Sequence, residues 1–94
     1  MSPHHIAITV YGRTGCHLCD EAVSMIRELR LPGVEVDVCE VDIEADDRLL
    51  KAFLERIPVV EMNGAIIGEL EIEPGQVREA IVAAVSIGSN EHDD

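Results

Sequence analysis

The sequence predicts one α/β domain in the order β-α-β-α-β-β-α, with a mixed four-stranded sheet flanked by three helices. Two observations lead to this class. Apolar residues along the 94-residue chain alternate between strand-like and helix-like spacing. Asn63-Gly64 separates two short apolar runs, and this dipeptide favours the tight turn of a β-hairpin, so the last two strands are expected to be antiparallel.

The first half of the chain predicts a β-α-β unit. Residues 5–11 are an apolar run typical of a buried strand. A helix follows and ends at Pro32-Gly33. Its apolar positions are Leu18, Ala22, Val23, Ile26 and Leu29. Residues 34–41 form the second strand, whose apolar residues change phase after Val38. This change indicates either a strand covered on both faces or one that ends in a bulge.

The second half predicts a helix, the hairpin and a closing helix. Asp46-Asp47 mark the positive end of the first of these helices, which continues through Leu49, Leu50, Phe53 and Leu54 and stops before Pro58. Residues 59–62 and 65–67 are the hairpin strands. Pro74 begins the closing helix and Gly88 lies just past its end. A right-handed crossover makes the first strand central in the sheet. Residues 1–94 form one domain, with flexible termini expected over 1–4 and 89–94.

Composition restricts the classes of partner. Seven basic and 19 acidic residues give a formal charge of -12, which repels nucleic acid and anionic membranes. No apolar segment approaches the roughly 18 residues that span a bilayer, and no targeting signal is present, so we expect a cytoplasmic protein. The acids gather over residues 35–47 and 69–73. They indicate a solvated edge strand and loop, or a docking face for a basic partner.

The motif Cys16-His17-Leu18-Cys19 directly follows the first strand and begins a helix. Cysteines at this spacing form a small reactive disulfide, with the first thiol on the exposed helix tip and the second one turn inside. Buried core cysteines are one alternative. Another is a zinc site that uses both cysteines, Cys39 and one of His4, His5 or His17. We predict that Cys39, on the second strand, is a buried small hydrophobe, with regulatory oxidation as the alternative.

The chain resembles the glutaredoxin branch of the thioredoxin fold over nearly its whole length. The resemblance is carried by the element order together with Tyr11, Arg13, Cys16, Cys19 and Ile57-Pro58. It implies a thioredoxin fold of glutaredoxin type and a thiol–disulfide oxidoreductase that acts on protein or small-molecule disulfides. An iron–sulfur cluster shared between two chains is known in some glutaredoxins and is kept as an alternative.

Each motif residue then has an expected role. Cys16 lies at the positive end of a helix and is the nucleophile, whereas Cys19 resolves the mixed disulfide. Arg13 is expected to favour the thiolate and to meet a substrate carboxylate, with an ordinary surface arginine as the alternative. His17 either favours the thiolate or is a solvent-exposed residue without a role. Tyr11 is a further candidate for tuning the thiolate or binding substrate. The resemblance implies a cis Ile57-Pro58 bond against the cysteine pair, which leaves the backbone of Ile57 free to pair with an extended substrate.

The chain departs from the family after the hairpin. Glutathione-binding glutaredoxins usually carry a Gly-Gly pair there, but this chain has Gly68-Glu69-Leu70-Glu71. Glu69, Glu71 and Glu73 would place negative charge where a carboxylate of glutathione should lie. We expect a monomer with no metal and no resident cofactor, reduced by glutathione, another low-molecular-weight thiol or a flavoprotein reductase. The alternative function is a redox-sensing interaction module switched by the Cys16–Cys19 disulfide.

Overall fold

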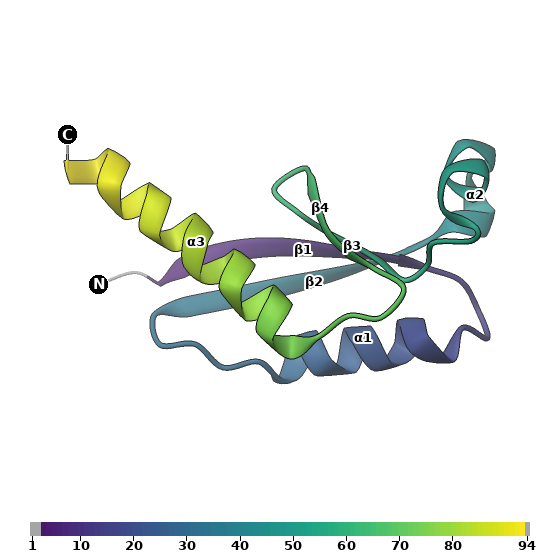
Figure 1. The fold of residues 1–94 in the computed structure, drawn as a ribbon, viewed down its shortest axis with the longest axis horizontal. Helices are drawn as coiled ribbons and strands as arrows, with labels where there is room; N and C mark the ends of the chain where they lie inside the picture. The colour runs from purple at the N-terminus through teal and green to yellow at the C-terminus, as the bar shows by residue number, and fades with distance from the viewer. Residues whose placement is uncertain (1–2, 94) are drawn as a thin grey trace.

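The computed structural model describes residues 3–93 of the chain, with side chains through residue 86. Figure 1 shows the predicted order of strands and helices. The elements are β1 (His4–Gly12), α1 (His17–Glu28), β2 (Val34–Asp42), the 3-10 helix η1 (Ile43–Ala45), α2 (Asp47–Phe53), β3 (Val59–Met62), β4 (Ala65–Glu69) and α3 (Pro74–Asp93). The short helix η1 was not predicted, because its three residues are too few for a periodic pattern.

The four strands form one mixed sheet in the order β2-β1-β3-β4. β1 pairs in parallel with β2 and antiparallel with β3, and β3 pairs antiparallel with β4. β1 is therefore central, as the crossover rule predicts, and its C-terminal end leads directly into the cysteine motif. Together with the three α-helices, this architecture confirms the predicted α/β class.

Helices α1 and α3 pack on one face of the sheet and enclose the main core. Ile6, Ile8 and Val10 of β1 are buried against apolar residues of both helices. The helical residues are Ala22, Val23 and Ile26 of α1 and Val77 and Ile81 of α3. Full burial of one such aliphatic side chain contributes about 1.5–3 kcal/mol. This packing fixes the start of α1 against the end of β1, which is where the cysteines lie.

The hairpin between β3 and β4 has the predicted turn. Asn63 and Gly64 have φ angles of 53° and 84°, so both central residues lie in the left-handed region that a type I′ turn requires. Glycine adopts this region without steric cost, and asparagine tolerates it better than most residues. The pairing of β3 with β4 shifts by one residue between Val60 and Glu61, and this bulge was not predicted.

Strand β2 lies at one edge of the sheet, in agreement with its acidic composition. Its pairing with β1 is continuous from His4 with Val34 to Gly12 with Asp42, so this ladder contains no bulge. Val34, Val36 and Val38 pack against the main core, whereas Val41 pairs with Tyr11 and points to the opposite face. The change of apolar phase is therefore not a bulge. The face that carries Val41 is covered only in part, since Val41 is half-buried and Cys39 is exposed.

Cys39 is an exposed free thiol, so the prediction that it is buried is wrong. It pairs with Thr9 on the face of the sheet opposite to α1 and α3. Helix α2 reaches that face only at its end, where the ring of Phe53 lies 5.0 Å from that of Tyr11. Nothing in α2 is fully buried, and this partial cover leaves Cys39 open to solvent.

Two further predictions concern the ends of the chain. The predicted end of the last helix before Gly88 is wrong, because α3 continues through Asp93. A glycine inside a helix costs only about 1 kcal/mol relative to alanine and is not by itself a stop signal. The flexibility expected at the termini falls in part on residues 1–2 and 94, which lie outside the described residues. No helix in the described part of the chain is long and apolar enough to cross a membrane.

Candidate active site

The first cysteine of the motif caps helix α1. The chain leaves β1 at Gly12, and the N–H of Cys16 donates to the carbonyl of Arg13 at 3.2 Å, which closes a turn. Cys16 has extended backbone angles (φ -87°, ψ 102°), and its Sγ accepts a hydrogen bond from the N–H of Cys19 at 3.2 Å. A sulfur atom thus occupies the position of an N-cap oxygen and receives one of the unpaired donors of the first turn. This environment favours a thiolate.

Cys16 and Cys19 form a disulfide, with their Cα atoms 5.2 Å apart. Cys16 is half-buried, whereas Cys19 exposes only 5% of its surface. This asymmetry agrees with a first sulfur that a substrate can reach and a second one that it cannot. The disulfide does not cross-link distant elements of the fold, because the two cysteines are three positions apart in the sequence.

Gly12 makes room for Cys19 and was missed by the sequence analysis. A Cβ atom at Gly12 would lie 2.8 Å from the Cβ of Cys19 and 2.9 Å from its Sγ. Real side chains do not approach so closely, so the strand can pass the buried sulfur only where the residue is glycine. The available signal was a glycine at the end of a buried strand, four residues before the first cysteine.

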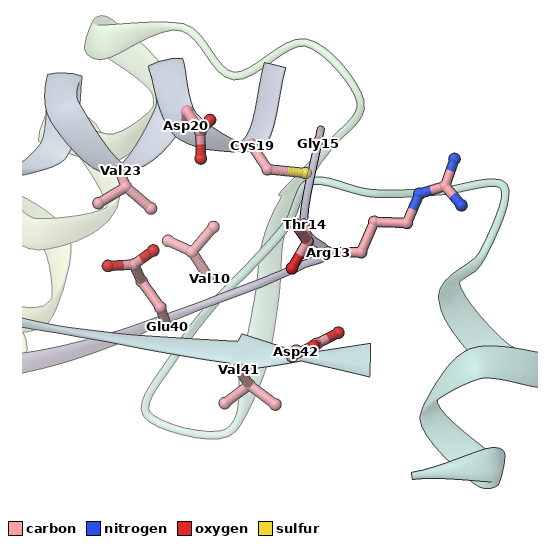
Figure 2. Close-up of a pocket in the computed structure, with 11 residues that line it drawn as sticks. Val10, Arg13, Thr14, Gly15, Cys19, Asp20, Val23, Glu40, Val41 and Asp42 are labelled. Carbon is pink, nitrogen blue, oxygen red and sulfur yellow. The ribbon is translucent and has the colours of Figure 1, made fainter. Parts of the chain in front are cut away.

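A cavity of about 390 Å³ opens beside Cys19, between the start of α1 and the end of β2. Figure 2 shows the sulfur of Cys19 at its edge, with the carboxylates of Asp20, Glu40 and Asp42 around it. The Arg13 side chain extends away from that sulfur (Figure 2). Arg13 is exposed and makes no ion pair within the described residues, so its charge is available to a substrate.

His17 lies between the cysteines in sequence but faces solvent. Its side chain is 86% exposed, and its Nε2 lies 2.8 Å from Oε2 of Glu21 one turn along α1. When His17 is protonated, this carboxylate offsets its charge. The predicted effect of His17 on the Cys16 thiolate is correspondingly weakened by Glu21.

Tyr11 lies on the opposite face of the sheet from the main core and links three elements. Its hydroxyl donates to Oε1 of Glu61 on β3 at 3.3 Å, and its ring packs against Phe53 of α2. Partial burial, followed by the charge and hydrogen bond of Glu61, raises the pKa of Tyr11. The residue therefore remains a neutral phenol at physiological pH.

The bond between Ile57 and Pro58 is cis, as the resemblance implies. Pro58 is fully buried, and its carbonyl accepts a hydrogen bond from the N–H of Leu70 at 2.9 Å. The N–H of Ile57 donates to the carbonyl of Phe53 at 3.1 Å. The expectation of a wholly free Ile57 backbone is therefore wrong, because the end of α2 occupies its donor. The Ile57 carbonyl has no partner among the residues described and can still accept a bond from a substrate.

Glu69 is paired, which changes the charge expected after the hairpin. Arg56 Nη2 donates to Glu69 Oε2, and the guanidinium also lies 5.1 Å from the centre of the Phe53 ring. The hydrogen bond with Arg56 lowers the pKa of Glu69, and the same contact raises the pKa of Arg56. Glu69 therefore presents little net charge to a ligand, which leaves Glu71 and Glu73 as the acids to consider there.

Metal ligands do not converge on the motif in the part of the chain that the structure describes. No three His, Cys, Asp or Glu side chains there gather around a common point. Cys39, which the zinc alternative requires, points from the exposed face of β2. The described side chains therefore supply no third ligand to the cysteine pair.

Comparison with family models decides where the chain belongs. Residues 7–84 match the model described as Glutaredoxin-like domain (DUF836), and this span contains both cysteines, the cis-proline and all four strands in part or whole. The chain belongs to the glutaredoxin-like domain family. No curated protein matches it at a significant level. Membership in the glutaredoxin-like family and the Cys16–Cys19 pair support a redox role on a thioredoxin-like fold.

Proposed function

We propose that this glutaredoxin-like protein is a thiol–disulfide oxidoreductase that reduces protein or small-molecule disulfides through Cys16 and Cys19. The proposal is supported above all by one observation. Cys16 is the reachable sulfur of a two-cysteine pair and caps a helix N-terminus, where its Sγ already accepts a backbone hydrogen bond. Such a position lowers the free energy of the thiolate, which is the attacking species in disulfide exchange.

The reaction has two exchange steps. The Cys16 thiolate attacks one sulfur of a substrate disulfide, forms a mixed disulfide and expels the other sulfur as a thiolate, which takes up a proton. Cys19 then loses its proton and attacks Sγ of Cys16, which closes the Cys16–Cys19 disulfide and releases the second substrate thiol. Two electrons pass from the two cysteine thiols to the substrate disulfide.

The cycle requires an external reductant of the oxidised pair. Glutathione, another low-molecular-weight thiol or a flavoprotein reductase would supply two electrons and restore both thiols. We propose that the protein acts as a monomer in the cytoplasm, where thiols are kept reduced. The protein itself needs no resident cofactor for either exchange step.

Turnover tests the proposed activity. The protein is mixed at catalytic concentration with an excess of a small disulfide, such as 2-hydroxyethyl disulfide, and dithiothreitol as reductant. We expect many equivalents of product per equivalent of protein above the uncatalysed rate. Release of a single equivalent followed by a stop would contradict an enzyme and favour the redox-sensing module.

A further inference from the structure

A groove of about 320 Å³ lies between the first turns of α1 and the segment that joins β4 to α3. Its apolar lining residues are Leu18, Ala22, Met25, Leu70 and Ile72. Leu18 stands between the two cysteines in sequence, so the α1 side of the groove begins at a residue one position before Cys19. Leu18 was predicted to lie on the apolar face of α1, but it is 48% exposed because it faces this groove.

Leu70 is held in an unusual conformation at the other side of the groove. Its φ angle is +64°, a left-handed conformation that is unfavourable for a residue other than glycine. The Leu70 N–H donates to the carbonyl of Pro58 at 2.9 Å and lies 3.2 Å from the carbonyl of Arg56. These contacts keep the Leu70 backbone in place. The side chain gains little burial in return, since Leu70 is 50% exposed. A large apolar side chain is thus presented to solvent in the same groove as Leu18.

The rim of the groove is acidic. Glu21, Glu71 and Glu73 line it, and no lysine or arginine does. Glu21 has His17 as a partner, which offsets its charge only when the imidazole is protonated. Glu71 and Glu73 make no ion pair with any side chain that the structure describes. Apolar walls with unpaired carboxylates at the edge complement a ligand that is apolar and cationic.

We propose that this groove binds the peptide segment next to the target cysteine of a disulfide substrate. An apolar side chain of that segment lies between Leu18 and Leu70, and a lysine or arginine of the segment faces Glu71 and Glu73. The inference rests on the proposed thiol–disulfide chemistry and adds the class of substrate. Cationic peptide disulfides are favoured over anionic ones, including the disulfide of glutathione.

The test compares three cystine peptides of equal length in single-turnover reactions with the pre-reduced protein, which need no added reductant. One peptide carries leucine and lysine beside each cysteine, the second has glutamate in place of lysine, and the third has serine in place of leucine. The rate constant for oxidation of the Cys16–Cys19 pair is measured at low and high salt. We expect the first peptide to react about tenfold faster than the second, an advantage that salt reduces.

Variants assign the preference to the groove. Glu71→Gln with Glu73→Gln should remove most of the preference for lysine over glutamate. The control is Glu55→Gln with Glu79→Gln, which changes the net charge equally at exposed positions outside the groove. Leu70→Asn should remove the preference for leucine over serine, because asparagine tolerates a positive φ and keeps the backbone.

The outcomes separate the two proposals. If no peptide oxidises the pair, the proposed function itself fails. If all three peptides react at one rate, or if the control variant removes the lysine preference as fully as the groove variant, the chemistry stands and the groove assignment is overturned. A faster reaction with the glutamate peptide would also overturn it.

Discussion

At the scale of single residues, contacts around Cys19 decide how the second sulfur is kept from solvent. The sequence identified both cysteines by their spacing, but the role of Gly12 depends on how closely a strand passes a helix and cannot be read from local pattern. The same holds for Cys39 and for the N–H of Ile57. Helix α2 decides both cases, because it leaves Cys39 uncovered and its last turn accepts the N–H of Ile57. The spacing of apolar residues does not show how far a short helix extends over a sheet.

Gly12→Ala should destabilise the oxidised protein by about 1–3 kcal/mol, because the added methyl group has no space beside Cys19. Gly75→Ala is the matched control, since a Cβ there meets nothing within 4 Å, and it should be neutral or stabilising by up to about 1 kcal/mol. Denaturant unfolding of both variants measures the difference. Equal stability of the two would mean that the contact is not tight.

Tyr11 should titrate above the ordinary tyrosine pKa, because partial burial and Glu61 both disfavour the phenolate. The chain has one tyrosine and no tryptophan, so near-ultraviolet absorbance against pH reports this group alone. Glu61→Gln should move the midpoint down towards the ordinary value without reaching it, since burial is the larger cause. A midpoint at the ordinary value in the unmodified protein would contradict the packing described for Tyr11.

At the scale of elements, hydrophobic periodicity and turn chemistry were sufficient for the four strands, the three α-helices and the hairpin, but not for the short helix η1. They did not give the bulge in β3 and β4 or the continuation of α3 past Gly88, because neither depends on a local stop signal. The side-chain contacts that join one element to another could not be predicted from the sequence either. Arg56, before β3, holds Glu69 at the end of β4 and covers Phe53 of α2.

The Arg56–Glu69 pair should make part of the protein's stability depend on pH. The pKa of Glu69 is lower in the folded than in the unfolded chain, so the contribution of the pair is present above the unfolded pKa of about 4.3. It is lost as the pH falls through the folded pKa. Glu69→Gln should therefore be less stable than the unmodified protein at neutral pH and converge with it in acid. If the thermal midpoints of the variant and the unmodified protein differed by the same amount at every pH from neutral to acid, the Arg56–Glu69 pair would be excluded as the source of that difference.

At the scale of the whole molecule, the chain carries a formal charge of -12 and one Cys-x-x-Cys pair. This charge, the fold class and the position of the cysteine pair could be predicted from the sequence alone. The groove could not, because Leu18 and Leu70 are 52 positions apart and only the folded chain brings both to it. We therefore expect the groove, which only the folded chain creates, to select among disulfide substrates.

Glutathione should be a weak reductant of the oxidised pair, because it is an anion and must approach Glu71 and Glu73. The apparent KM for glutathione should fall several-fold between low and high salt, as the screening length shrinks from about 10 Å at 0.1 M to about 3 Å at 1 M. Cysteamine, a cationic thiol, is the control and should show the opposite trend. Efficient and salt-independent turnover with glutathione would show that the acidic residues do not govern the choice of reductant.

The most direct test of the central claim is to trap the mixed disulfide on one cysteine. Both Cys16→Ser and Cys19→Ser are made in a Cys39→Ser background, because the exposed Cys39 thiol would otherwise react as well. Each variant is exposed to a disulfide substrate and its intact mass is measured. The account predicts a stable adduct on Cys16 in Cys19→Ser and little or none in Cys16→Ser. An adduct on Cys19 alone, or none on either cysteine, would contradict it.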